Sequence, residues 1–547
     1  MGATQSTEGS NSTLAYPGQT LQNDERKTHS NSHGLAAAGE TPALPRNIPS
    51  PLGSVLLTGD RRKSLIDALQ AELRRAGQSI TQKYRSRRRG FVLQVTFGDD
   101  DVVLYEAAAG TLSDAPASPP MKIDSLFEIA SCTKLIVAAC LLHLIHQGRE
   151  SVPEYSGSTA ASDSFRLPVR RELPSKMSLQ SRLCDLVDFS SPECPFARLL
   201  VSPSGKDWTP YVTLSNLLSH TSGIADYWKP SERGANRQNA WLAKFIADPN
   251  RVWKADEILK HIRDLPRDPR VSETLRRLEQ EQKTWVHAPS FRYNYSDTNY
   301  VVIARLMEML TGCALEEIIQ FHTQRLALPS MIMSYSALVS QPRGSEATVA
   351  KAPEQSEEAK RMAVTHPPTS SWARVPSMTS PLLLPLCAHR YEGSEDLFNV
   401  PRQSADWGGG GLISNVTDMA KMMRAIFVKP YYDAVLSRPS THSRLNFFES
   451  LQPVLELLER IEPTGDEDVY YAHGLFIIDA DSDDDNEKSA RLFGHEGHGN
   501  SFMYTWLAAG ITFVGSTNTT SGNWFEDVVY DLTLAIRRVF RRFGIRM

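Results

Sequence analysis

The sequence predicts an α+β fold, because strand-like segments stand near both ends of the chain and apolar helices lie between them. Residues 91–97 and 102–107 have strand character, and Gly98–Asp100 between them indicates a hairpin. Residues 501–507 and 511–516 have the same character near the other end. We therefore expect the first and last strands to pair in one antiparallel sheet.

Several segments between and around these strands are expected to be helical. Residues 60–77 predict an amphipathic helix, because Leu65, Leu69 and Leu73 recur at four-residue spacing. The segments Leu135–Ile145 and Tyr300–Leu310 are apolar, and a helix that is apolar nearly all round is a buried helix. The other expected helices are residues 214–218, 241–282, 416–427 and 525–543.

The chain divides into a short N-terminal segment and one large domain. Residues 1–55 are rich in Ser, Thr, Asn, Gly and Pro, so we expect them to be disordered. Residues 56–547 would form the folded domain, interrupted by polar insertions near 149–180, 339–378 and 479–490. The last of these is acidic, but it lacks the glycine and glutamate that a calcium-binding loop needs.

Composition excludes several classes of protein. Hydrophobic residues make up 41% and charged residues 22%, as in ordinary globular proteins. The net charge of −4 gives no broad basic field for nucleic acid, and the short basic run at 85–89 lacks interleaved aromatics. The six cysteines form no C-x-x-C pair and no Cys/His ligand spacing, which favours a reduced, cytoplasmic protein over a disulfide or zinc protein.

Membrane association is expected to be peripheral if it occurs. No stretch approaches the roughly 18 apolar residues that span a bilayer, and the N-terminus lacks a signal-peptide pattern. Met1–Ser6 fits the myristoylation pattern with Gly2 as acceptor, although so short a pattern also arises by chance. One myristoyl chain binds weakly, so the basic clusters 83–89 and 537–546 are candidates for a second contact, or else solvated surface.

The stretch that carries chemistry is Ser131-Cys132-Thr133-Lys134, at the head of the apolar segment Leu135–Ile145. On a helix Ser131 and Lys134 would lie on one face, about a turn apart. A lysine with a lowered pKa can take the serine proton, and the helix N-terminus suits a developing oxyanion. The alternative is a serine N-cap followed by a surface lysine.

Two further clusters could complete such a site. Tyr295-Ser296-Asp297 precedes the second apolar helix, and a tyrosine beside a lysine ammonium can have its pKa lowered and shuttle protons. Alternatively, Tyr295 is an aromatic core residue. In the third cluster, His495-Glu496-Gly497 leads into His498, whose N–H could join that of Ser131 as an oxyanion donor. Two alternatives for this cluster are a glycine-rich turn and a metal-binding pair formed by His495 and His498.

Five stretches in order resemble the serine β-lactamase and penicillin-binding-protein superfamily, in its class C-like branch of esterases, D-aminopeptidases and acyltransferases. They are residues 125–134, 212–224, 289–300, 408–414 and 493–497. The resemblance implies a β-lactamase/transpeptidase-like fold. Its antiparallel sheet, built from the N- and C-terminal strands, would be flanked by helices, with an all-helical region carrying the Ser131 helix.

The resemblance also implies roles for the site residues. Ser131 would be the acylated nucleophile, Lys134 its base and Tyr295 the catalytic tyrosine. The segment His495–Gly497 would match the family's Lys-Thr-Gly motif and bind substrate. No metal or organic cofactor is implied, and the 212–224 block that contains His220 is mostly structural.

Two of these positions depart from the family pattern. Asp297 stands where the family often has an asparagine, and its charge would favour the charged amine of Lys134. His495 in place of lysine removes a positive charge that would hold a penicillin carboxylate.

These observations predict a serine hydrolase that forms an acyl-serine on a small ester, amide or D-amino-acid peptide. An acyltransferase of the same family is the first alternative. A catalytically silent scaffold or binding protein of the same fold is the second, and the intact Ser131, Lys134 and Tyr295 argue against it.

Overall fold

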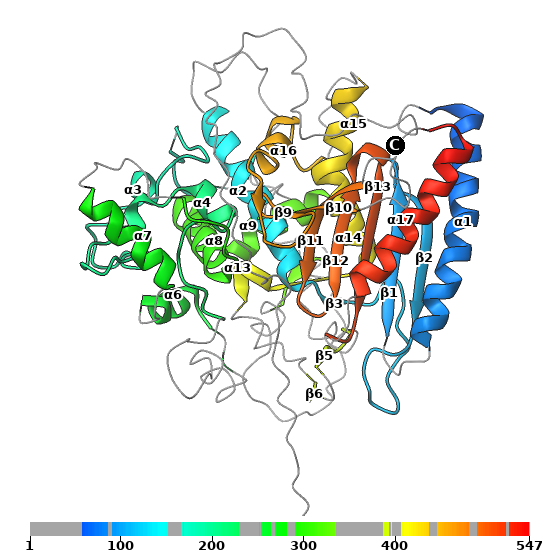
Figure 1. Ribbon diagram of the computed structural model, residues 1–547, viewed down its shortest axis with the longest axis horizontal. Coiled ribbons are helices and arrows are strands. Elements are labelled where there is room, and N and C mark those ends of the chain that lie inside the picture. Colours follow the sequence, from blue (N-terminus) through cyan, green and yellow to red (C-terminus); the bar gives the residue numbers. More distant parts are fainter. Residues whose placement is uncertain are drawn as a thin grey trace, which may run out of the picture.

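The fold is described here from a computed structural model of the chain (Figure 1). It describes residues 57–85, 90–150, 166–228 without 168 and 175, 251–263 without 252, 268–281, 290–334, 387–396 without 393 and 394, 406–436, 446–480, 490–520 and 524–545. Within these residues the chain forms a large antiparallel sheet with helices on both faces and a helical region beside it. The α+β prediction is therefore confirmed.

The central sheet has eight strands, each antiparallel to its neighbours. In spatial order they are β2 (Val102–Ala109), β1 (Phe91–Phe97), β13 (Ile511–Thr517), β12 (Ser501–Trp506), β11 (Ala490–Gly497), β10 (Phe476–Ala480), β9 (Val469–Tyr471) and β8 (Glu462–Pro463). Phe91 lies opposite Thr517 and Phe97 opposite Ile511, so the first and last long strands pair as expected.

A second, three-stranded sheet positions the site. It consists of β3 (Phe127–Glu128), β7 (Leu412–Ser414) and β4 (Ile332–Met333), with β7 in the middle. β3 leads directly toward Ser131, and β7 follows the run of four glycines. A small hairpin, β5 (Tyr391–Glu392) and β6 (Glu395–Asp396), lies apart from both sheets.

Two terminal helices cover one face of the large sheet (Figure 1). They are α1 (Gly59–Arg85) and α17 (Trp524–Arg542), which also pack against each other. Leu65, Leu69 and Leu73 are fully buried in the cluster between these helices and the sheet, as the four-residue spacing predicted. α1 continues eight residues beyond the expected end at residue 77, to Arg85.

The helices that bear on the site lie beyond the other face. They include α2 (Thr133–Glu150), α8 (Asp297–Thr311), α13 (Trp407–Gly410) and α14 (Val416–Met423). The remaining described helices are α3 (Leu183–Leu186), α4 (Leu214–Leu218), α6 (Ala255–Arg263), α7 (Pro269–Gln280), α9 (Leu315–Arg325), α15 (Lys429–Val435), α16 (Gln452–Leu457), the 3₁₀ turns η1 (Ala130–Cys132), η4 (Thr209–Tyr211) and η8 (Leu507–Ala509), and the π-helical η7 (Arg424–Val428).

Two expectations about helices need correction. The single helix expected over 241–282 is instead two helices in its described part, and α7 begins where Asp268 caps the chain and Pro269 occupies the first helical position. The segment Ala130–Gly148 is also long and apolar enough to cross a membrane, contrary to the expectation that no such stretch exists. Here 89% of its apolar window is buried in the protein, as in a core helix.

Several expectations lie outside the described residues. These are the expected disorder of residues 1–55 with Gly2, the insertion expected at 339–378, and most of the insertions expected at 149–180 and 479–490. The basic side chains at 83–89 and Arg546 also lie outside the description. Within the second basic cluster, Arg537 is only 1% exposed, so its guanidinium is a core group rather than part of a solvated surface.

Candidate active site

Ser131 lies in the short turn that joins β3 to α2. Ile129 N–H donates to Leu412 O at 3.0 Å, and Leu412 N–H donates to Thr133 Oγ1 at 3.2 Å, so β7 holds the chain on both sides of Ser131. Ala130 has a φ of 45°, a left-handed conformation that is costly for a residue with a side chain. The backbone before Ser131 is therefore strained and fixed by its neighbours.

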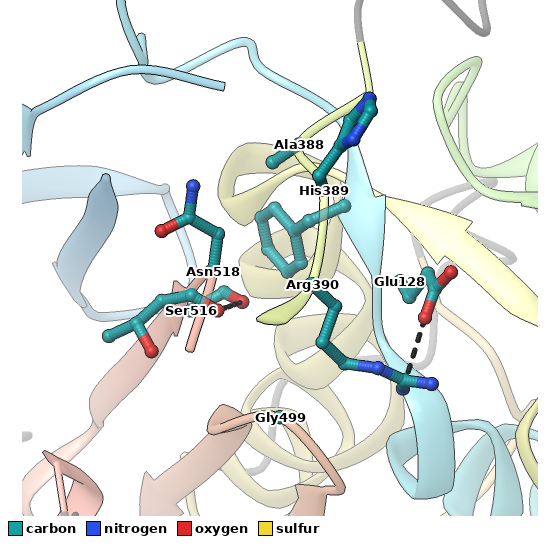
Figure 2. A pocket seen from close by; sticks show the side chains of 9 residues that line it. Glu128, Ala388, His389, Arg390, Gly499, Ser516 and Asn518 are labelled. Atoms are coloured by element: carbon teal, nitrogen blue, oxygen red, sulfur yellow. Dashed lines mark hydrogen bonds and ion pairs between the residues drawn. The ribbon is translucent and has the colours of Figure 1, made fainter. Parts of the chain in front are cut away.

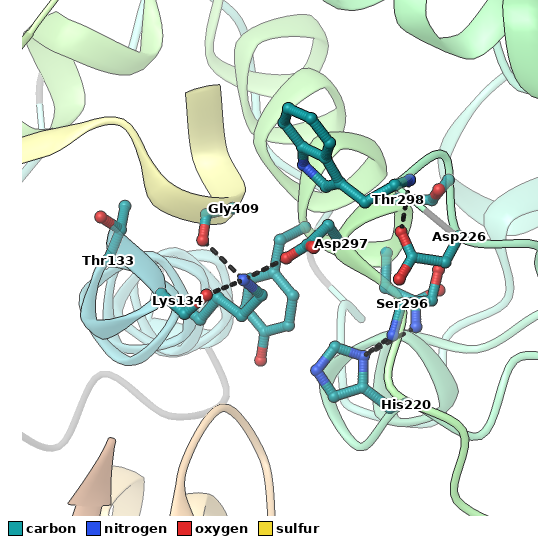
Figure 3. A network of polar contacts seen from close by, with 12 residues as sticks. Thr133, Lys134, His220, Asp226, Ser296, Asp297, Thr298 and Gly409 are labelled. Atoms are coloured by element: carbon teal, nitrogen blue, oxygen red, sulfur yellow. Dashed lines mark hydrogen bonds and ion pairs between the residues drawn. The ribbon is translucent and has the colours of Figure 1, made fainter. Parts of the chain in front are cut away.

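Lys134 is fully buried and its ammonium meets three oxygen atoms (Figure 3). Nζ lies 2.9 Å from Ser131 Oγ, 2.6 Å from Gly409 O and 2.5 Å from Asp297 Oδ1. A lysine ammonium has three N–H donors and no acceptor, so each donor has a partner here. The arrangement is that of a charged lysine that donates to Ser131.

The glycine run brings the Gly409 carbonyl to Lys134. A Cβ on Gly408 would lie 2.5 Å from Ala304 Cβ and 2.8 Å from Tyr300 O, so only glycine allows α13 to pack so closely on α8. This approach places the backbone of Gly409 beside the lysine. The family block 408–414 was predicted from the sequence, but the contact of the Gly409 carbonyl with Lys134 was not.

Tyr295 lies beside the ammonium but its pKa shifts in the direction opposite to the one expected. Lys134 Nζ is 5.0 Å from the centroid of the Tyr295 ring. Burial, followed by the negative charge of Asp297, raises the pKa of Tyr295 well above its ordinary value, and hydrogen bonding with Ser131 opposes them. The expectation of a lowered pKa is therefore wrong: burial dominates, and Asp297 counters the positive charge of the lysine. Tyr295 is a neutral phenol here.

His495 belongs to a chain of hydrogen bonds whose direction the backbone fixes. Ser296 N–H donates to His220 Nδ1 at 3.2 Å, so a neutral His220 carries its proton on Nε2 and donates it to the Tyr471 hydroxyl at 3.2 Å. The Tyr471 hydroxyl then donates to His495 Nε2 at 3.1 Å. His495 Nδ1 donates to the Glu496 carbonyl at 2.6 Å, because a carbonyl can only accept.

This chain leaves His495 neutral and occupied at both ring nitrogens. Burial, followed by the positive charge of Lys134, lowers the pKa of His495 to about 3. The ring therefore supplies no positive charge at neutral pH. The metal-pair interpretation of His495 and His498 also fails, because neither nitrogen of His495 is available, and no metal-binding cluster of three or more His, Cys, Asp or Glu occurs among the described residues.

Gly497 brings the end of β11 against the chain that enters Ser131. A Cβ there would lie 2.4 Å from Ile129 O and 2.1 Å from Ser501 Oγ. The Ser501 hydroxyl donates to Ile129 O at 2.9 Å, and the Cys132 thiol donates to His495 O at 3.2 Å. His498 follows directly in the β11–β12 turn, and its role as an oxyanion donor stays a prediction.

The structure thus brings Ser131, Lys134, Tyr295, Asp297 and the His495–Gly497 strand end together. His220 is hydrogen-bonded to Ser296 N–H and to the Tyr471 hydroxyl, and these bonds hold the residues around the site. Tyr471, Asp406 and Arg390 also lie at this site and were not predicted from the sequence. Asp406 precedes the glycine run, and burial together with the charge of Asp297 raises its pKa to about 7. Nothing in the local sequence marks these three residues, because only the fold brings them near Ser131.

The comparison with protein families defines the class: this chain belongs to the beta-lactamase family, whose model matches residues 65–537. The resemblance seen in the sequence is thereby confirmed. A curated relative, Esterase EstB of Burkholderia gladioli, is 35% identical over 126 residues, which is 23% of this chain. The match spans only 22% of EstB.

Solved structures with a similar chain course include two bacterial proteins. The D-amino acid amidase of Ochrobactrum anthropi SV3, in complex with D-phenylalanine, has a TM-score of 0.49 and 16% identity, covering 87% of this chain and 99% of the amidase. A penicillin-binding protein of Bacillus halodurans has a TM-score of 0.46 and 16% identity, covering 82% of this chain and 96% of that protein.

Replacing His495 with Gln should remove a pH-dependent part of the free energy of unfolding. The pKa of His495 falls from 6.5 to about 3 on folding, so below pH 6.5 the unfolded state binds more protons. The stabilisation is complete above that pH and is lost as the pH falls toward 3. Chemical denaturation should show the parent losing about 2 kcal/mol more than the variant between roughly pH 8 and 5.

His473→Gln repeats this test at a second buried histidine. Burial lowers the pKa of His473 to about 4, so its effect on the free energy of unfolding has the same sign. Glu496 and Asp406, whose pKa values are raised to about 7, act with the opposite sign but are present in the parent and both variants. If the difference in the free energy of unfolding between the parent and His495→Gln did not change with pH, the assignment of a neutral, buried His495 would be contradicted.

Proposed function

We propose that this protein is a serine hydrolase that forms an acyl-serine at Ser131 on a small ester, amide or D-amino-acid peptide. The observation that carries the proposal is the 2.9 Å contact between Ser131 Oγ and the fully buried Lys134 Nζ, in a chain of the beta-lactamase family. A serine held against a buried amine is the arrangement that nucleophilic catalysis requires. Tyr295 beside both groups supports the same proposal.

Activation of Ser131 begins with a proton transfer within the buried ion pair. Lys134 donates to Ser131 in the resting state, so it accepts the serine proton only after releasing one of its own. Asp297 Oδ1, at 2.5 Å, is the acceptor for that proton. The neutral amine then turns its lone pair to Ser131 and takes the hydroxyl proton as Oγ bonds to the substrate carbonyl carbon.

Tyr295 supplies the proton that the leaving group needs. Its raised pKa keeps the phenol protonated, so the hydroxyl donates as the bond to the leaving group breaks. Lys134, now an ammonium again, returns a proton to the phenolate, and Asp297 returns its proton to the lysine. The N–H groups of Ser131 and His498 hold the oxyanion, and water then releases the acyl group by the reverse sequence.

The surroundings of His495 favour a substrate without a carboxylate near the scissile bond. The ring is neutral and both its nitrogens are hydrogen-bonded within the protein. An anionic group placed beside it would be desolvated without a partner from this residue. We therefore favour an ester with an uncharged acyl group, and the partial match to an esterase agrees with this choice.

A fluorophosphonate probe tests the nucleophile. Intact mass spectrometry should find one adduct on the parent protein and none on Ser131→Ala, because the probe reacts with an activated serine only. Ser204→Ala removes an exposed hydroxyl and should leave the adduct unchanged. A folded parent protein that stays unlabelled, or a labelled Ser131→Ala variant, would refute the proposal and favour the scaffold interpretation.

A pair of chromogenic substrates tests the preference for uncharged acyl groups. The value of kcat/KM for p-nitrophenyl butyrate should exceed that for nitrocefin, a cephalosporin with a carboxylate, by at least about 100-fold, which corresponds to roughly 2.7 kcal/mol. The reason is that His495 offers no charge to the carboxylate. Equal values, or faster turnover of nitrocefin, would show that another cation binds the carboxylate.

A further inference from the structure

We propose that Arg390 is the positioning residue of the oxyanion site, holding the turn that carries His498 against the segment that enters Ser131. The inference rests on the proposed function and adds a residue that no motif marks. Arg390 is far from Ser131 and His498 in the sequence. It lies between β4 and the glycine run at 408–411.

One guanidinium nitrogen connects the two sides of the site, and Figure 2 shows its ion pair with Glu128. Arg390 Nη1 lies 3.0 Å from Glu128 Oε2, and it donates to His498 O at 3.3 Å. Glu128 ends β3 and precedes Ser131 by three residues. The two side chains are only 18% and 4% exposed, so their ion pair is largely shielded from water.

The stem of Arg390 also packs on the turn itself. Gly499 has a φ of 95°, and a Cβ there would lie 2.5 Å from Arg390 Cδ, so the arginine occupies the space that a side chain would fill. On the far side of the turn, Asn500 Nδ2 donates to Thr519 O at 2.7 Å. The turn is therefore fixed by Arg390 at one end and by Asn500 at the other.

Arg390 is itself held by its neighbours' backbone. Ala388 N–H donates to Leu126 O at 2.7 Å, His389 N–H donates to Leu112 O at 2.8 Å, and Tyr391 N–H donates to Asn518 O at 3.0 Å. These bonds tie the segment to the chain before β3 and after β13. The backbone that carries the Arg390 side chain is therefore held in place.

The position of the turn matters because an oxyanion donor must point at the site where negative charge develops. A misplacement of about 1 Å can reduce a rate by about 100-fold. Without Arg390, the His498 carbonyl loses this donor and Glu128 loses this partner beside Ser131. The donor at His498 would then be displaced while the substrate pocket remains, so the loss should appear in kcat rather than in KM.

The test measures kcat and KM for p-nitrophenyl butyrate, and the thermal midpoint, in Arg390→Gln and Arg390→Lys. Arg390→Gln should lower kcat by about 10- to 100-fold with KM within about threefold. Arg390→Lys keeps the charge and should recover part of that loss. Arg424→Gln is the matched control, since it breaks another ion pair of low exposure, with Asp101, and should change kcat by less than about twofold even if its midpoint falls equally.

Unchanged kcat in Arg390→Gln, or a loss no greater than in Arg424→Gln, would overturn the proposal. If Arg390→Gln does not fold, Glu128→Gln serves instead: it removes the negative charge of the ion pair while keeping the size of the side chain, and unchanged kcat there would also overturn the proposal. Fluorophosphonate labelling separates the two claims. An unlabelled parent refutes the hydrolase itself, whereas a labelled parent with a fully active Arg390→Gln refutes only the role of Arg390.

Discussion

The buried ammonium of Lys134 is the constraint on which the site depends. A charged group without solvent exposure costs several kcal/mol unless partners satisfy it. One of its three partners is Ser131, just before its own helix, and the other two come from distant parts of the chain: Asp297 at the start of α8 and the carbonyl of Gly409 in α13. Satisfying this one charge therefore fixes α2, α8 and α13 relative to one another, and the same geometry fixes the position of the Ser131 hydroxyl.

Close backbone approaches make that geometry reachable. Gly408 lets α13 sit on α8, and Gly497 lets the end of β11 touch Ile129 O. A side chain at either position would collide with backbone atoms, so a substitution would move the Gly409 carbonyl or the His498 turn away from Ser131. Around this frame, neutral groups complete the site: Tyr295 stays a phenol and His495 stays uncharged, because burial disfavours the charged form of each.

Local sequence patterns predicted much of this structure. The leucine spacing in 60–77 and the strands at both ends identified the sheet and its covering helix, because burial on one face leaves a periodic pattern. The ordered family blocks brought Ser131, Lys134, Tyr295 and His495 to one site. Sequence patterns could not predict the direction of the Tyr295 pKa shift, because it depends on burial in the folded state. They also could not place Tyr471 and Arg390 at the site, because only tertiary packing brings these residues there.

A double-mutant cycle on Lys134 and Asp297 tests the central claim most directly. Chemical denaturation would give the free energy of unfolding of the parent, Lys134→Met, Asp297→Asn and the double variant. If the ion pair organises the site, Lys134→Met and Asp297→Asn should each cost about 3–5 kcal/mol and the double variant no more than either single change, because removing both charges leaves none unpaired. Additive losses would contradict the account, since they would mean that the two charges do not depend on each other.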